Sequence, residues 1–137
     1  MKNPIVHFEI PADDVERAKN FYKKIFGWEM NRFQLADGDY WIVRTTDVDD
    51  KMMPTTPGAI NGGLMQRKNP GQPFMNYVSV ESIDEMCRKI TASGGTVIMP
   101  RQEIGQGMGW IAAFKDTEGN IMGLHQMQPS QQSGKKD

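Results

Sequence analysis

Apolar and polar positions in the first half of the chain alternate in ways that predict one strand, one helix and three more strands. Residues 4–10 alternate between apolar and polar side chains, which is typical of a half-buried strand. Apolar residues then recur with helical spacing from Val15 to Ile25, and Gly27 is suited to end that helix. Asp13 and Glu16 have the spacing of a capping box at its start. The three later strands are expected at 28–35, 40–45 and 59–66.

The second half of the chain repeats this pattern. A strand is predicted at 74–80, and Ser82 and Glu85 have capping-box spacing before a helix that ends at Gly94 and Gly95. Gly27 and Gly95 both end helices, and the dipeptide Trp-Ile occurs in a corresponding strand of each half. Three further strands follow, at 96–103, 110–115 and 120–127.

The repeat predicts an α+β fold built from two βαβββ modules. We assign residues 1–67 to the first module and 68–128 to the second, within one domain. Neither module is large enough to close a core alone, so we expect a curved mixed sheet around a cleft, with the helices on its outer face. The polar tail at 129–137 is expected to be disordered.

Composition narrows the classes of partner and the compartment. The net charge is −1, so no basic face is available to make nucleic acid the main partner. No apolar run approaches the ~20 residues of a membrane helix, and the N-terminus lacks the apolar core of a secretion signal. The single cysteine, Cys87, cannot form an internal disulfide. Together these features predict a cytoplasmic protein with no membrane partner.

Three stretches of the chain carry a family resemblance. They are HFEIPADDVERAKNFYKKIFGWE at 7–29, VSVESIDEMCRKITASGGTV at 78–97 and FKDTEGNIMGLHQ at 114–126. Together they resemble the vicinal-oxygen-chelate superfamily, which contains glyoxalase I, bleomycin-resistance proteins and extradiol dioxygenases. The FGW ending and the GLxQ strand are most similar to a bacterial subgroup related to lactoylglutathione lyase. The resemblance covers about residues 4–128 and implies that such modules pair, as a homodimer.

The resemblance also implies where a metal ion would bind. The family takes one ligand from the first and one from the last strand of each module, which gives His7, Gly63, Met75 and Gly123 here. Only His7 suits a divalent ion, because glycine has no donor side chain and a thioether is a poor ligand for such ions. We therefore expect no metal cofactor, which disfavours glyoxalase I and extradiol dioxygenase activity.

Three polar residues are candidates for catalysis. If His7 faces the cleft, alternation places Glu9 beside it, and His125 faces the cleft from the last strand. Histidine titrates near neutral pH, and a carboxylate would orient it, so His7, Glu9 and His125 suit metal-free acid–base chemistry. Alternatively, the same three residues form a displaced site for a divalent metal, or Glu9 only orients His7 or accepts hydrogen bonds from a ligand.

Five residues are candidates for contact with the bound molecule. Methionines suggest a soft pocket, a tyrosine hydroxyl could stabilise an enolate, and a tryptophan pair could sandwich a flat ligand or pack in the core. These candidates are Trp41, Met65, Met75, Tyr77 and Trp110.

The sequence thus predicts a protein that binds a small organic molecule in the cleft of its sheet. The alternatives are a metal-free isomerase or lyase of the lactoylglutathione-lyase type that uses His7, Glu9 and His125, and a lyase or dioxygenase with a displaced metal site.

Overall fold

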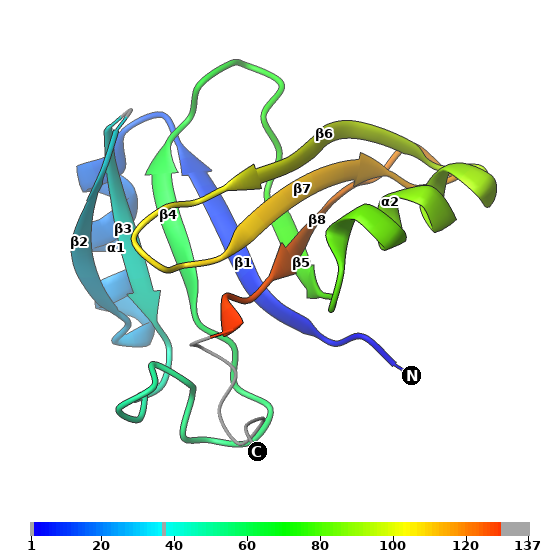
Figure 1. The fold of residues 1–137 in the computed structure, drawn as a ribbon. Helices are drawn as coiled ribbons and strands as arrows, with labels where there is room; N and C mark the ends of the chain where they lie inside the picture. Colours follow the sequence, from blue (N-terminus) through cyan, green and yellow to red (C-terminus); the bar gives the residue numbers. More distant parts are fainter. Residues whose placement is uncertain (1, 37, 130–137) are drawn as a thin grey trace. The chain divides into compact units, whose positions relative to one another are not determined.

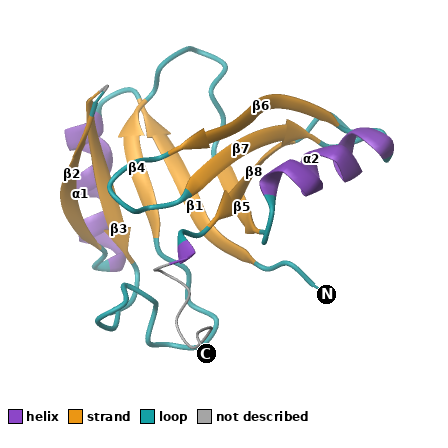
Figure 2. Ribbon diagram, viewed as in Figure 1, coloured by secondary structure: helices purple, strands orange, loops and turns teal. Residues whose placement is uncertain are grey.

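The computed structural model describes residues 2–36 and 38–129 and contains, within them, the βαβββ order twice (Figures 1 and 2). The first set is β1 (Ile5–Ala12), α1 (Val15–Phe26), β2 (Glu29–Leu35), β3 (Gly38–Arg44) and β4 (Gly62–Gln66). The second set is β5 (Met75–Ser79), α2 (Ile83–Ala92), β6 (Thr96–Glu103), β7 (Trp110–Lys115) and β8 (Ile121–Gln126). The predicted α+β fold of two βαβββ modules is confirmed. Apart from Pro129, the tail expected to be disordered lies outside the described residues.

Contacts divide the chain into two compact units. One is His7–Met75, called the N-terminal unit here, and the other runs from Asn76 onward together with the residues before His7, called the C-terminal unit. The strand order is β2-β3-β4-β1 in the first module and β5-β8-β7-β6 in the second. In each module one pair of strands is parallel, β1 with β4 or β5 with β8, and the other neighbours are antiparallel. Both modules are therefore mixed sheets.

In the N-terminal unit, α1 covers one face of the sheet. Ile10, Val43 and Leu64 form its buried core, and Val15 and Tyr22 pack against them from the helix. The N-cap of α1 is Asp14, whose Oδ1 accepts the Arg17 N–H at 3.0 Å, rather than the predicted Asp13. Gly27 ends the helix as predicted, with φ of 72°. Because neighbouring residues on a strand alternate between faces, His7, Glu9 and Gly63 point away from α1.

In the C-terminal unit, α2 covers one face of its sheet in the same way. Val80, Ile83 and Leu124 are buried there together with Ala112. The N-cap is Ser82, whose side chain accepts the Glu85 N–H at 3.2 Å, as the capping-box pattern predicted.

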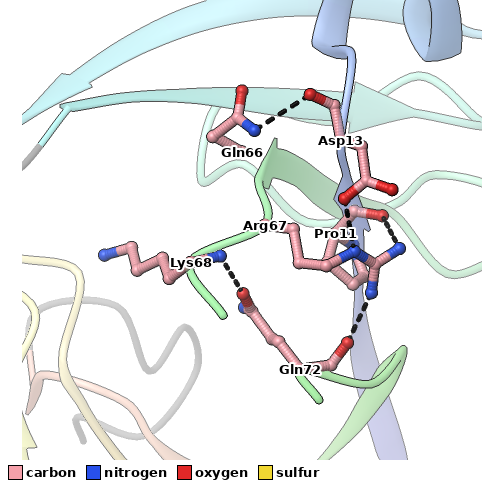
Figure 3. Close-up of polar contacts among 6 residues, drawn as sticks. All are labelled: Pro11, Asp13, Gln66, Arg67, Lys68 and Gln72. Atoms are coloured by element: carbon pink, nitrogen blue, oxygen red, sulfur yellow. Dashed lines mark hydrogen bonds and ion pairs between the residues drawn. The ribbon is translucent and has the colours of Figure 1, made fainter. Parts of the chain in front are cut away.

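The end of β4 is fastened to the turn before α1 by Arg67 (Figure 3). Its guanidinium donates to Asp13 Oδ1 at 2.9 Å, to the Gln72 carbonyl at 2.6 Å and to the Pro11 carbonyl at 3.4 Å. Gln66 donates to the Asp13 carbonyl at 3.0 Å beside it. Asp13 is thus used to hold the end of β4, which explains why the next residue caps the helix.

No helix in the described part of the chain is long and apolar enough to cross a membrane.

Candidate functional site

Three polar side chains meet on the face of the N-terminal sheet opposite α1. The Tyr40 hydroxyl lies 2.7 Å from His7 Nε2 and donates a hydrogen bond to Glu9 Oε2 at 3.0 Å. His7 Nε2 and Glu9 Oε2 are 4.0 Å apart. The side chains of His7 and Glu9 are 32% and 20% exposed. We call His7, Tyr40 and Glu9 the polar trio; it is partly shielded from water and still reachable.

Hydrogen counting assigns the proton positions in the trio. A tyrosine hydroxyl has one hydrogen, and here it goes to Glu9. His7 Nε2 must then carry the proton of the 2.7 Å bond, with the Tyr40 oxygen as acceptor. In neutral His7 the second ring nitrogen, Nδ1, is consequently the one without a proton. A carboxylate at the end of such a chain orients the imidazole and stabilises its protonated form.

Gly63 makes room for the Tyr40 hydroxyl. Glu9 pairs with Gly63 across β1 and β4, and Tyr40 pairs with Met65 across β3 and β4. A Cβ atom built on Gly63 would collide with the hydroxyl and ring of Tyr40. The absence of a side chain at residue 63 therefore lets the tyrosine reach across β4 to Glu9.

Sequence reasoning missed Tyr40, although the chain contained a signal for it. Residues 40–45 were predicted as a strand, and Trp41 packs on the α1 side of the sheet. Alternation then places Tyr40 on the opposite face, with His7 and Glu9. The hydroxyl could have been considered a partner of His7 on that ground.

The C-terminal unit also places a tyrosine ring against a glycine of its last strand. Tyr77 pairs with Gly123 across β5 and β8, and a Cβ atom on Gly123 would collide with the Tyr77 ring. Tyr77 is only 5% exposed.

His125 lies in the C-terminal unit, on β8. Its Nε2 is 3.0 Å from the Met108 carbonyl oxygen, which can only accept, so Nε2 carries a proton. Burial lowers the pKa of His125 below the ordinary value of 6.5, and the bond to Met108 acts in the opposite direction. This histidine therefore holds the loop between β6 and β7.

The two tryptophans pack beside the helix-covered cores of their units. Trp41 packs against the core under α1, and Lys19 Nζ lies 3.1 Å from its ring centroid. Trp110 packs against the core under α2, with the Arg101 guanidinium carbon 5.7 Å from its ring centroid.

The two candidate methionines occupy different surroundings. Met65 is 8% exposed and pairs with Tyr40, next to the polar trio. Met75 is partly buried at the start of β5.

Metal donors are sparse at the positions named by the family resemblance. Gly63 and Gly123 offer no donor, and tyrosine rings occupy the space in which their side chains would start. Within residues 2–36 and 38–129, no group of three or more His, Cys, Asp or Glu side chains is placed to hold a metal ion.

Comparison with known proteins places most of the chain in one family. Residues 4–123 match the Glyoxalase family, described as the Glyoxalase/Bleomycin resistance protein/Dioxygenase superfamily. A "Glyoxylase-like domain-containing protein" of Didymella fabae is 32% identical over 117 residues, which cover 82% of this chain and 84% of that protein. "Putative glyoxylase CFP32" of Mycobacterium bovis is 29% identical over 122 residues, 86% of this chain. The chain spans only 43% of the length of that relative.

Solved structures agree with this fold. Methylmalonyl-CoA epimerase from Mycobacterium tuberculosis has a TM-score of 0.66 at 16% identity, covering 92% of this chain and 89% of that one. The hypothetical protein BH1468 from Bacillus halodurans has a TM-score of 0.68 at 12% identity and is covered completely, as is this chain. At such identities the likeness concerns the fold. With the family match over residues 4–123, it follows that the chain belongs to the glyoxalase/bleomycin resistance protein/dioxygenase superfamily.

Proposed function

We propose that the chain binds a small organic molecule on the sheet face that carries the polar trio, and that His7 exchanges a proton with it without the family's metal ion. The observation that carries the proposal is the Tyr40 hydroxyl, which connects His7 Nε2 at 2.7 Å with Glu9 Oε2 at 3.0 Å. A base whose orientation is set by a second group is the usual arrangement of a general acid–base catalyst.

The proposed chemistry is proton transfer next to a carbonyl group. His7 takes the proton from the carbon, and the electron pair of the broken C–H bond moves into an enolate. His7 then carries a positive charge, which the Glu9 carboxylate stabilises through Tyr40. Return of the proton to the same or a neighbouring carbon gives an isomerase; expulsion of a leaving group from the enolate gives a lyase.

The donor set supports a reaction without the family's divalent ion. His7 is the one good ligand at the four family positions, while Met75 offers a soft thioether and the two glycines offer nothing. Because the Tyr40 hydroxyl lies where a side chain of residue 63 would start, a ligand at that position does not fit beside it. No step of the proposed reaction is therefore routed through a metal.

Binding without turnover is the second candidate. Met65 pairs with Tyr40 and is 8% exposed, so an apolar side chain packs beside the polar trio. A ligand with one polar and one apolar end would be held there even if no proton moved.

Deuterium exchange tests the proposal directly. The protein is incubated in D2O with a panel of small ketones and keto acids, and loss of the signal of the proton next to the carbonyl is followed by NMR. We expect exchange with at least one compound, and a fall of about 100-fold in His7→Ala, the low end of the usual contribution of a general base. Chelator treatment should leave the rate unchanged; loss of exchange on chelation would contradict the metal-free reaction.

Tyrosine variants provide the matched control. Tyr40→Phe removes the hydroxyl of the trio, whereas Tyr22→Phe removes a hydroxyl on α1, where the Tyr22 ring contacts Phe21. Exchange should slow in Tyr40→Phe and stay at the wild-type rate in Tyr22→Phe. Calorimetry should show that both variants keep the wild-type affinity for the ligand. Equal loss of affinity and exchange in His7→Ala and Glu9→Ala would favour binding alone.

A further inference from the structure

A basic side chain lies on the same face of the N-terminal sheet as the polar trio. Val43 is fully buried in the core under α1, so its neighbour on β3, Arg44, points to the opposite face. Arg44 is the last residue of β3, and its side chain is partly buried. The proton transfer proposed for the trio gives this residue no role.

The strand register places Arg44 opposite His7. Phe8 pairs with Gly62 across β1 and β4, and Gly62 pairs with Val43 across β4 and β3, so these three residues form one row. Because β1 is parallel to β4 and β3 is antiparallel to it, the step back to His7 and the step on to Arg44 lead to the same side of that row. His7 and Arg44 therefore lie opposite each other across β4, about 10 Å apart, which is two strand spacings.

The guanidinium of Arg44 has no acidic partner in the described part of the chain. Arg32, Arg67 and Arg101 each lie between 2.9 and 3.7 Å from an aspartate oxygen, and the other two arginines are exposed. Glu29 stands opposite Arg44 on β2, yet no ion pair joins the two side chains. Partly buried charges are normally paired, and a guanidinium carries five N–H donors. An anion supplied by a ligand would fill this role.

The backbone from which Arg44 extends is held in place by Asn61. The Asn61 Oδ1 accepts the N–H groups of Thr45 at 2.7 Å and Thr46 at 3.1 Å. The Thr45 hydroxyl donates to the Ile60 carbonyl at 2.7 Å. These bonds fix the end of β3, and a side chain on a fixed backbone loses less conformational freedom when it binds a ligand.

We infer that Arg44 binds a carboxylate of the molecule on which His7 acts, so that the substrate is a small keto acid; this inference rests on the proposed function. A guanidinium presents two parallel N–H donors that match the two oxygens of a carboxylate. Side chains stand roughly perpendicular to a sheet, so the ends of the two side chains are also separated by about 10 Å. Contacts of about 3 Å at each end leave about 4 Å for the ligand. An α-keto acid spans that gap with the carbon next to its carbonyl group at His7 and its carboxylate at Arg44.

The charges on this face of the sheet favour the same orientation of the ligand. Glu9 lies on β1 with His7, and its negative charge repels a second carboxylate on that side of β4. Arg44 lies on the other side of β4 and attracts it. A bound keto acid therefore places its charged end away from Glu9 and presents its C–H bond to His7. A neutral ketone lacks the group that would orient it in this way.

Calorimetry with α-ketobutyrate and its methyl ester tests the inference. The two probes share the carbonyl group and the C–H bonds next to it, and only the acid is charged. We expect the wild-type chain to bind the acid more tightly than the ester. Arg44→Gln should weaken binding of the acid about 10- to 100-fold, the usual effect of removing hydrogen bonds to a charged group, and leave binding of the ester unchanged.

Two further variants control for charge and for folding. Arg32→Gln removes an arginine from the α1 side of the same sheet, where Arg32 pairs with Trp41, and should bind the acid as the wild type does. Arg44→Lys keeps the positive charge without the paired donors, so its loss of affinity for the acid should be smaller than that of Arg44→Gln. Circular dichroism checks that each variant is folded, and Arg44→Lys carries the test if Arg44→Gln is not.

Three results would overturn the inference. They are a wild-type chain that binds the acid no more tightly than the ester, an affinity for the acid that neither Arg44 variant lowers, and an equal loss of that affinity in Arg44→Gln and Arg32→Gln. The proton exchange proposed for His7 can fail separately. A wild-type chain that binds the acid through Arg44 but exchanges no deuterium contradicts the proposed function alone, whereas exchange with equal affinity for acid and ester contradicts only the role of Arg44.

Discussion

Each unit places a tyrosine over a glycine of its last strand, but the two tyrosines come from different strands. In the N-terminal unit Tyr40 comes from β3 and places its hydroxyl over Gly63, whereas in the C-terminal unit Tyr77 comes from β5 and places its ring against Gly123. Tyr77 stands 68 residues after Glu9, the same offset that relates Met75 to His7 and Gly95 to Gly27. The two tyrosines are therefore not counterparts in the repeat, although each places its ring beside the last-strand glycine of its module. Gly95 was predicted to end the second helix, but α2 ends at Ala92 with Ser93 as its C-cap.

The largest expected difference in stability is between Gly123→Ala and Gly63→Ala. A methyl group on Gly123 meets the middle of a buried ring, whereas on Gly63 it first meets the hydroxyl end of the less buried Tyr40, which can swing away. Overpacking costs about 1–3 kcal/mol, so we expect about 3 kcal/mol for Gly123→Ala and about 1 kcal/mol for Gly63→Ala. Urea unfolding measures both. Equal losses would show that the two tyrosines are held equally tightly.

The tryptophans give the next contrast. Lys19 is 9% exposed and lies over Trp41, while the Arg101 side chain is 42% exposed and farther from Trp110. Lys19→Ala should reduce the free energy of unfolding by about 2 kcal/mol, through the lost cation–π contact and the lost packing of its stem. Arg101→Ala should cost no more than about 0.5 kcal/mol. Lys19→Met keeps the apolar stem, so its loss of unfolding free energy should fall between those of Lys19→Ala and Arg101→Ala. A Lys19→Ala variant as stable as the wild type would contradict the cation–π contact.

The helix N-caps should behave alike in the two units. Asp14 and Ser82 each accept a backbone N–H three residues later, so their replacement by alanine removes the same kind of bond. We expect about 1 kcal/mol of destabilisation from each substitution. Differential scanning calorimetry of the two single variants provides the comparison. A much smaller loss of stability in one variant would show that tertiary contacts hold the start of that helix without the cap.

The smallest expected effect is a pH dependence from His125. Its pKa is lower in the folded chain than the ordinary value near 6.5, so below that pH the unfolded chain binds more protons. Stability should accordingly be complete above about pH 6.5 and decline as the pH falls towards the folded pKa. His125→Gln keeps a donor for the Met108 carbonyl and should flatten the decline between about pH 7.5 and about pH 5.5 in urea titrations. An unchanged slope would assign the decline to other groups.

The fold could be predicted from sequence because both modules agree locally with it. Periodicity, a capping serine at 82 and a helix-ending glycine at 27 each indicate the element that the structure contains. Side-chain faces also followed from alternation, which placed His7 and Glu9 together. Alternation does not predict how far a side chain extends across the sheet. Tyr40 extends across β4 to Glu9, and it can do so only because residue 63 has no side chain.

Other details depend on contacts from distant parts of the chain, which decide which of two similar side chains takes a role. Asp13 and Asp14 are both good caps by type, and the choice of Asp14 follows from Arg67, which belongs to a strand end more than fifty residues away. Trp41 and Trp110 could be placed at related positions by the repeat. That a largely buried lysine lies over Trp41 is not encoded in any local pattern, because lysine on a helix normally indicates an exposed position.

Gly63 and Tyr40 also constrain how this chain could acquire new chemistry. A carboxylate at residue 63 collides with the tyrosine, and a smaller residue at 40 alone leaves His7 without its hydroxyl partner. We therefore expect the effects of substitutions at the two positions to depend on each other. An acidic side chain at residue 63 calls for a change at residue 40 as well, so directed evolution towards such a site needs libraries that vary both codons at once.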